Sequence, residues 1–408
     1  MLGIFNCIMK VLFLLLFSYQ GFYMLVSLFR KEQKEDFELN YHHFAVLICA
    51  RNEETVISDL LKSIADQTYP KEYYQTFVMA DNCDDSTAEA ATNNGAKVYI
   101  RKNSDLIGKG YALESLLKDI EKDYGDEFDA YLVFDADNIL KEDYLEQMNV
   151  SYCKGNRIIA GYINSKNYDS NWISAGYSLY LLRKNRFLNN ARYLLGLSSA
   201  INGTGFLFDK EIVKDWSYHT LTEDIEFTVD QVCRHHMIAY CDKAIVYDEQ
   251  PTSLIQSFYQ RLRWSKGYLQ VIQKYSKRLF EGIGEGYFSY FDMLSTLLSA
   301  YGLSVISLIF DVLTFSFLIA TKNNPIPFLS NLLDGALQAY LCMYAIGLLT
   351  TITEWKRINI SAYRKIGYTF TFPLFMATYI PIAFYALFAD VSWKPIKHTV
   401  TIAHENSF

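Results

Sequence analysis

The sequence lacks three features that would assign it to common protein classes. Its seven cysteines are scattered and form no C-x-x-C pair, which predicts reduced thiols in a cytosolic environment and no disulfide framework. It has no excess of positive charge: the formal net charge is −7, so no nucleic-acid partner is expected. It contains no internal repeat and no low-complexity linker. With 408 residues, 51% of them hydrophobic, the chain can form a large core together with membrane segments.

Long apolar runs lie near both ends of the chain. Residues 11–29 are long enough to span a bilayer, and Arg30 and Lys31 follow at once. Because no small-x-small cleavage site follows this run, we predict an anchor rather than a signal peptide. Three further spans are predicted within 291–321, 331–353 and 367–389.

The basic residues beside these runs predict an orientation. They cluster at 30–34 and 356–365, whereas the loop 322–328 is less basic. The positive-inside rule therefore places residues 30–286 and 355–366 in the cytoplasm. We expect a multi-pass protein of the plasma membrane.

Between the first and second spans, short apolar runs alternate with helical patterns. The runs at 45–50, 76–81, 96–100 and 131–135 predict buried strands, and helices are expected between them. This alternation predicts an α/β fold with a mostly parallel central sheet. In such sheets ligands bind beyond the carboxyl ends of the strands. Asp81 and Asp135 each end a predicted strand, so we expect both in one crevice.

Several residues near these strand ends suit a phosphate-bearing ligand. Asp135 and Asp137 place two carboxylates at i and i+2, which suits Mg²⁺ or Mn²⁺ with donor phosphate oxygens completing the coordination. Asp81 suits the base or ribose of a nucleotide. Lys109 stands at a predicted helix start, where it could meet a phosphate. The alternatives are a solvated acidic turn for Asp135 and Asp137 and a solvated helix start for Lys109.

A second acidic motif follows a glycine-bearing loop. Gly203 and Gly205 would allow the backbone to approach a ligand closely. After them come Thr222, Glu223 and Asp224, and we predict that Asp224 is a general base that takes a proton from an acceptor hydroxyl. An ordinary capped helix N-terminus is the alternative, and the two interpretations are compatible.

Residues 253–276 predict an amphipathic helix in the membrane interface. Arg261 and Arg263 are permanent cations suited to a diphosphate leaving group. Trp264 offers a flat face on which a sugar can stack. A plain membrane-surface helix is the alternative, since Arg and Trp are common there.

Taken in order, five motifs resemble the membrane-integrated family 2 glycosyltransferases, which include cellulose, hyaluronan and poly-N-acetylglucosamine synthases: ICARNEE (48–54), DNCDD (81–85), DAD (135–137), TED (222–224) and QRLRW (260–264). The resemblance implies a GT-A fold, a UDP-sugar donor and inversion to a β-linkage. It implies a donor site of Ala50, Asn52, Glu53, Asp81, Lys109, Asp135, Arg261 and Arg263, and an acceptor side of Asn202, Gly203, Thr204, Gly205 and Trp264. It also implies a metal site of Asp135 and Asp137 and a catalytic set of Asp224, Glu223 and Arg263.

The expected organisation follows from these motifs and spans. It comprises an N-terminal membrane helix (1–30), a cytosolic GT-A domain (31–252), interface helices (253–286), about three membrane helices (287–392) and a tail (393–408).

We expect an inverting enzyme that adds glucose or N-acetylglucosamine to a growing β-linked polysaccharide, processively and with translocation across the membrane. One alternative is the transfer of a single sugar to a lipid carrier or membrane glycolipid. Another is a non-catalytic membrane partner, against which the intact set Asp135, Asp137, Asp224 and Arg263 argues. The sugar, the linkage and any partner subunits stay open.

Overall fold

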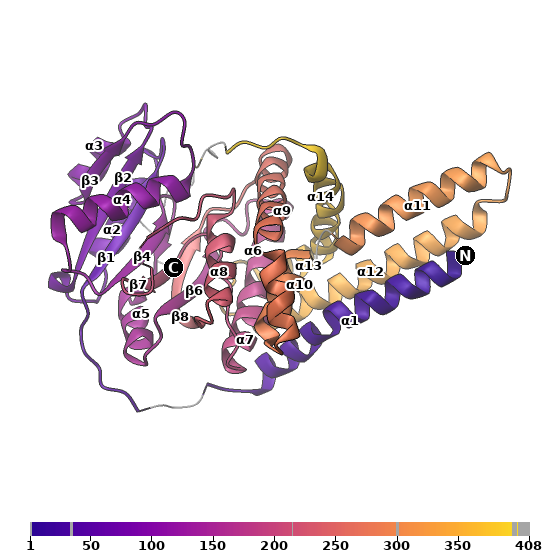
Figure 1. Cartoon of the computed structure of the whole chain (residues 1–408), viewed down its shortest axis with the longest axis horizontal. Coiled ribbons are helices and arrows are strands. Elements are labelled where there is room, and N and C mark those ends of the chain that lie inside the picture. Colours follow the sequence, from indigo (N-terminus) through magenta and orange to yellow (C-terminus); the bar gives the residue numbers. More distant parts are fainter. Residues whose placement is uncertain (1, 33–35, 214, 299–301, 394–397, 399–408) are drawn as a thin grey trace.

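The computed structural model describes residues 2–32, 36–213, 215–298, 302–393 and 398 (Figure 1). One part of the chain forms a sheet with helices around it. The helices α1, α11 and α12 extend away from that part, as Figure 1 shows. The helices are α1 (Leu2–Phe29), α2 (Ile57–Ala65), α3 (Thr87–Asn93), α4 (Lys109–Tyr124), α5 (Tyr144–Cys153), α6 (Trp172–Arg183), α7 (Asn190–Leu194), α8 (Glu223–Cys233), α9 (Leu254–Gly284), α10 (Phe288–Leu298), α11 (Gly302–Ala320), α12 (Ile326–Thr353), α13 (Ala362–Ala377) and α14 (Tyr379–Phe388).

The described residues form an eight-stranded sheet in the order β3-β2-β1-β4-β7-β6-β8-β5. Its strands are β1 (Phe44–Ala50), β2 (Tyr74–Asp81), β3 (Lys97–Arg101), β4 (Ala130–Asp135), β5 (Ile139–Leu140), β6 (Ile158–Ser165), β7 (Phe206–Asp209) and β8 (Ile238–Asp248). Strands β1 to β4 pair in parallel, whereas β7 runs antiparallel to both β4 and β6. The predicted α/β fold with a mostly parallel sheet is confirmed, and the four predicted strands are β1 to β4.

Alternate residues of the central strands pack on opposite faces of the sheet. In β1, Leu47 belongs to a buried cluster with Leu113 of α4. Its neighbour Val46 belongs to the cluster on the other face, with Leu60 of α2 and Leu145 of α5. Because helices cover both faces, every residue of β1 except Cys49 is buried, which explains its uninterrupted apolar sequence.

The helices after the sheet link it to the apolar helices. A π-helical turn, η2 (Lys184–Asn189), joins α6 to α7, so residues 172–194 form one continuous helical segment that contains a bulge. Helix α6 packs against α13, and η2 and α7 pack against α1. Between these elements, Arg192 and Asp292 form a buried ion pair, and Tyr19 and Tyr23 of α1 donate hydrogen bonds to Asp292.

Helix α9 is longer than predicted and is covered on part of its apolar face. Leu262 is buried with Ile382 and Ala386 of α14, and Phe258 and Leu269 pack against this group. The sequence predicted that this helix lies in the membrane interface, which stays a prediction. The structure places part of its apolar face against α14.

Three segments in the described part of the chain are long and apolar enough to cross a membrane: Val11–Phe29, Ile326–Thr353 and Ala362–Phe388. The predicted span 291–321 is divided, because residues up to Leu298 form α10, which packs on α9, and residues 299–301 lie outside the described residues. The apolar part of α11, Val305–Ala320, is shorter than the three.

Candidate active site

A cavity of about 230 Å³ lies at the carboxyl ends of β1, β2 and β4. It brings Asp81 and Asp135 together, as the strand pattern predicted. Helices α4, α6, α8 and α9 contribute further parts of its wall, together with loop residues. The predicted site residues in this wall are Ala50, Glu53, Asp81, Lys109, Asp135, Asp137, Asn202, Gly203, Thr204, Glu223, Asp224, Arg263 and Trp264.

Three predicted residues, Asn52, Gly205 and Arg261, do not contribute to this wall as the structure describes it. Arg261 is 1% exposed and donates hydrogen bonds to Thr378 Oγ1 (2.6 Å) and Phe375 O (3.3 Å). Its guanidinium also lies over the rings of Phe375 and Tyr379. Arg261 therefore fastens α9 to α13 and α14, and we do not carry forward the prediction that it binds the diphosphate.

Ion pairs hold the charged side chains at the strand ends. Asp81 accepts a hydrogen bond from Arg101 of β3 (2.5 Å). Lys109, the first residue of α4, pairs with Asp135 and donates to Gly203 O (2.8 Å). Burial alone would lower the pKa of Lys109, but Asp135 and Glu223 outweigh it and raise the pKa above its ordinary value. The ammonium therefore stays charged at neutral pH.

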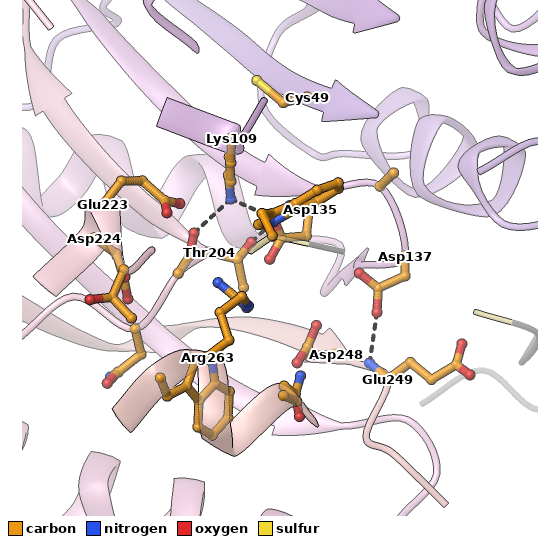
Figure 2. Close-up of a pocket in the computed structure, with 18 of the residues that line it drawn as sticks. Cys49, Lys109, Asp135, Asp137, Thr204, Glu223, Asp224, Asp248, Glu249 and Arg263 are labelled. Carbon is orange, nitrogen blue, oxygen red and sulfur yellow. Dashed lines mark hydrogen bonds and ion pairs between the residues drawn. The ribbon is translucent and has the colours of Figure 1, made fainter. Parts of the chain in front are cut away.

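The turn after β4 is fixed by hydrogen bonds from neighbouring elements. The Asp135 N–H donates to Thr204 Oγ1 (3.0 Å) and Asn138 Oδ1 (3.1 Å). The Glu249 N–H donates to Asp137 Oδ2 (3.0 Å), a contact drawn in Figure 2. Thr204, predicted on the acceptor side, thus uses its hydroxyl to shape the acidic turn.

Asp135 and Asp137 supply two carboxylates to one wall of the cavity. The described residues contain no group of three or more His, Cys, Asp or Glu side chains placed to hold a metal ion. Two carboxylates fit a hard divalent cation that takes its remaining ligands from phosphate and water oxygens. This donor set therefore fits a cation that binds together with a phosphate ligand.

Glu223 and Asp224 lie in the first turn of α8. In Figure 2, Lys109 and Asp135 lie between this pair and Asp137. A Cβ atom at Gly203 would lie 3.9 Å from Asp224 Oδ2 and 4.0 Å from Asp135 Oδ2, so these carboxylates border the same backbone. Gly203 has a φ of +84°, which favours glycine.

Both carboxyl groups of this pair have raised pKa values. Burial raises the pKa of Glu223 to about 7, and the charge of Asp224 adds to the shift while Lys109 and Arg263 oppose it. Burial also raises the pKa of Asp224, against the Ile225 N–H and nearby cations. A raised pKa makes a carboxylate a better proton acceptor at neutral pH.

Arg263 and Trp264 of α9 face the cavity together. Arg263 Nη1 donates to Leu221 O (2.7 Å), just before the acidic pair. The Trp264 ring meets Tyr177 edge-to-face, with centroids 5.8 Å apart. The cavity therefore combines a guanidinium suited to phosphate with an aromatic surface suited to a sugar.

Some cavity residues were not among the predicted site residues. Lys184, Asp248 and Gln260 line it, as do Trp393 and His398 from the end of the chain. The Arg51 guanidinium lies over the Trp393 ring (5.3 Å), and His398 Nδ1 is 3.0 Å from Glu53 Oε1. Gln260 begins the QRLRW motif, whereas Lys184, Asp248, Trp393 and His398 come from segments far apart in the sequence and belong to none of the five motifs.

Residues 42–267, more than half of the chain, match the family described as "Glycosyltransferase like family 2". The chain belongs to this glycosyltransferase family. The probable glycosyltransferase YdaM of Bacillus subtilis (strain 168) is 24% identical over 391 residues, which cover 87% of this chain and 84% of that protein. The beta-monoglucosyldiacylglycerol synthase of Nostoc sp. is 26% identical over 243 residues, which cover 55% of this chain and 48% of that protein. This family 2 enzyme thus aligns with only about half the length of the synthase.

A solved structure supports the fold of this glycosyltransferase. The mannosyltransferase PcManGT from Pyrobaculum calidifontis, in complex with GDP-Man and Mn²⁺, superposes with a TM-score of 0.60 at 14% identity. The match covers 92% of this chain and 98% of that one. The GT-A-like fold and the transferase class are therefore confirmed. The narrower resemblance to cellulose and hyaluronan synthases is not shown by these matches.

Proposed function

We propose that this enzyme transfers a sugar from a UDP-sugar to a hydroxyl group of a membrane lipid, with inversion at the anomeric carbon. The observation that carries the proposal is the construction of the cavity. One wall holds Lys109 and Asp135 at the strand ends, and Asp224 lies close by. Helices α6 and α9 also contribute to the wall, and they pack on α13 and α14 respectively.

Each charged residue has a role in the proposed reaction. Lys109 and Arg263 bind the diphosphate and stabilise the charge that develops on it as the sugar leaves. Asp224 accepts the proton of the acceptor hydroxyl while its oxygen attacks the anomeric carbon from the face opposite the diphosphate. Asp135 and Asp137 would hold Mg²⁺ or Mn²⁺, which when bound neutralises phosphate charge. Asp81, paired with Arg101, lies where the nucleoside is expected.

The exposure of the apolar helices supports a lipid acceptor. Only 6% of the apolar window of α12 is buried within the chain. In the described part of the chain this helix faces its surroundings, which suits contact with lipid. The match to a beta-monoglucosyldiacylglycerol synthase, whose name describes a lipid product, also supports this choice.

We propose that the sheet domain lies in the cytoplasm, as the sequence predicted, where nucleotide sugars are available. Val11–Phe29, α11 and α12 would cross the membrane, which returns the end of α12 to the sheet domain, where Arg357 pairs with Asp242. The α13–α14 segment would not cross it, because Trp393, which follows α14, lines the cavity.

Processive polysaccharide synthesis is the second proposal, and Trp264 supports it. Its indole lines the cavity beside Tyr177, where it could hold the terminal sugar of a growing chain. This function needs a translocation path, which a second copy or a partner subunit would have to help enclose.

The two proposals differ in product size. The purified full-length enzyme, with Mn²⁺ or Mg²⁺, would be incubated with labelled UDP-sugars, a GDP-sugar control and a mixed lipid extract. An organic-extractable product carrying one sugar supports the lipid proposal. A high-mass product that glycanases degrade contradicts it and favours the polymer synthase. The Asp224→Asn variant, incubated in parallel, shows whether the product depends on this site.

A further inference from the structure

Two buried amide oxygens on one side of the cavity have no hydrogen-bond partner in the described part of the chain: Asn202 Oδ1 and Gln260 Oε1. Both residues line the cavity that also holds Asp224. Asn202 precedes β7, and Gln260 belongs to α9, so two independent elements bring them there. Buried polar atoms are nearly always hydrogen-bonded, and two such oxygens in a ligand cavity point to donors on the ligand.

A lysine lies on the same side. Lys184 is 8% exposed and lines the cavity, and its charge lowers the pKa of Asp224. Its ammonium lies 5.4 Å from the centroid of the Tyr180 ring, and the described residues give it no carboxylate within ion-pair distance. Because this buried cation interacts with Asp224 but makes no ion pair, the position favours an anionic ligand group.

The backbone that carries Lys184 is a built feature. Lys184 begins the π-helical turn η2, a bulge of a kind that is frequent at functional sites. Asn185 Nδ2 donates to Ile163 O (2.7 Å). Asn189 Oδ1 accepts from the Ala200 N–H (3.0 Å), two residues before Asn202. The bulge and the loop with Asn202 are thus fixed to each other.

This side of the cavity adjoins the apolar helices. Helix α6, which ends at Arg183, packs on α13 and α12, and η2 packs on α1 (Figure 1). Lys184, which follows α6 and begins η2, therefore joins the cavity to the elements that pack on the apolar helices.

We propose that Lys184, Asn202 and Gln260 form the acceptor subsite, and that its acceptor is a phospholipid with a hydroxylated headgroup, such as a phosphoglycerol lipid. The lipid phosphate pairs with Lys184, and a headgroup hydroxyl donates to Asn202 Oδ1 or Gln260 Oε1. A second hydroxyl gives its proton to Asp224 as its oxygen bonds to the anomeric carbon and the bond from that carbon to the diphosphate breaks. UDP leaves with the electron pair. This inference rests on the proposed lipid transfer.

The test compares two acceptors that differ in the phosphoglycerol group. Dioctanoyl phosphatidylglycerol and dioctanoylglycerol are presented in the same neutral detergent micelles, so that surface charge does not concentrate the enzyme. The wild type should prefer the phospholipid. Lys184→Gln should raise the KM for the phospholipid about 10- to 100-fold, because this factor corresponds to the usual free energy of a hydrogen bond to a charged group. The KM for dioctanoylglycerol should stay within about twofold of the wild-type value.

Three controls separate binding from folding. Lys184→Arg keeps the charge and should keep most of the preference. Lys277→Gln removes a lysine of α9 whose side chain is 91% exposed, and should change neither KM. The Kd for UDP should be unchanged in Lys184→Gln, which shows that the donor site is intact.

Several results would overturn the inference. They are a wild type that uses dioctanoylglycerol at least as well, a Lys184→Gln variant that loses both acceptors equally, or a weakened Kd for UDP, which would assign Lys184 to the donor. A wild type that glycosylates no lipid but makes polymer contradicts the proposed function itself, and the inference falls with it.

Discussion

The two sides of the cavity hold their charges differently. On the donor side, charges are paired within the protein: Asp81 with Arg101, and Asp135 with Lys109. On the acceptor side, the described residues offer Lys184 no carboxylate within ion-pair distance, and the buried oxygens of Asn202 and Gln260 lack hydrogen-bond partners. A paired charge is held in place before a ligand arrives, whereas Lys184 can gain an ion pair from a ligand.

This difference suggests how each substrate binds. A metal–diphosphate must compete with Lys109 for Asp135, so donor binding rearranges existing ion pairs. An acceptor binds to Lys184, Asn202 and Gln260 without displacing a partner of the charged or hydrogen-bonding atom. Its charge can pair with Lys184, and its hydroxyl groups can donate to the two amide oxygens. The donor side should therefore set the metal and nucleotide requirement, and the acceptor side the lipid preference.

The largest effect is expected from changing Asp224, the proposed base between the donor and acceptor sides. Asp224→Asn should reduce kcat by about 10²- to 10⁴-fold, because the acceptor hydroxyl loses its proton acceptor. Donor binding should be unchanged, as measured by UDP titration calorimetry.

Glu223→Gln is the matched control, since it changes the neighbouring carboxylate of the same helix turn. It should retain far more activity than Asp224→Asn. Equal losses in both variants would mean that the pair acts as a unit, and near-normal turnover in Asp224→Asn would remove the base assignment.

The next effect tests the donor side. Asp137→Asn should raise the Mn²⁺ concentration needed for half-maximal activity about 10- to 100-fold or more. Mutation of a residue that only hydrogen-bonds to a metal ligand already lowers metal affinity by about this factor. Saturating Mn²⁺ should restore part of the activity. The acceptor KM at saturating metal should not change, and a variant whose only defect was in acceptor KM would contradict the separation of the two sides.

The donor side was largely predictable from the sequence. Asp81 and Asp135 end apolar strands, and parallel strands bring their carboxyl ends to one edge. Lys109 opens a helix that follows a strand, so its place at this edge also follows from local order. The strands β6 and β8 were missed: β6 is buried throughout yet contains glycine, asparagine and serine, so its sequence does not show its burial.

The acceptor side was less predictable, because distant elements form it. Lys184 belongs to a helical run in which nothing local distinguishes a cavity residue from a surface residue. Arg261 and Arg263 belong to one motif, but helix α9 directs them to different places, and the covering helices α13 and α14 decide which is buried. The burial of Arg261 depends on how α9 packs against α13 and α14, and the sequence pattern does not show which helices pack together.

A smaller effect is expected from two glycines, one on each side. A Cβ at Gly110 would lie 2.0 Å from Tyr218 O, so Gly110→Ala must shift the start of α4 and with it Lys109. A Cβ at Gly267 would lie 2.4 Å from Thr222 Oγ1, so Gly267→Ala must shift the residues just before Glu223. Each should cost about 1–3 kcal/mol of stability in thermal unfolding, as overpacking does.

The kinetic defects of the two variants should differ. Gly110→Ala should raise the donor KM, and Gly267→Ala should lower kcat at an unchanged donor Kd. Gly284→Ala, at a site with nothing within 4 Å, is the neutral control. If both variants shared one kinetic defect, the two sides would not be independent.

The smallest expected effect is a shift of the acid limb of the pH profile, measured with the neutral acceptor so that Lys184 has no phosphate to bind. Asp224 must be deprotonated to act, and burial raises its pKa, so kcat/KM should fall as the pH drops through a value above the ordinary range of Asp. Lys184 lowers the pKa of Asp224, so Lys184→Gln should move the acid limb to higher pH. Glu223→Gln removes the adjacent carboxylate and should move the acid limb to lower pH, because the two groups titrate as a pair.

Shifts of opposite sign in these two variants would show that the charges of Lys184 and Glu223 act on one base. If the acid limb stayed at the wild-type pH in both variants, a group other than Asp224 would be titrating.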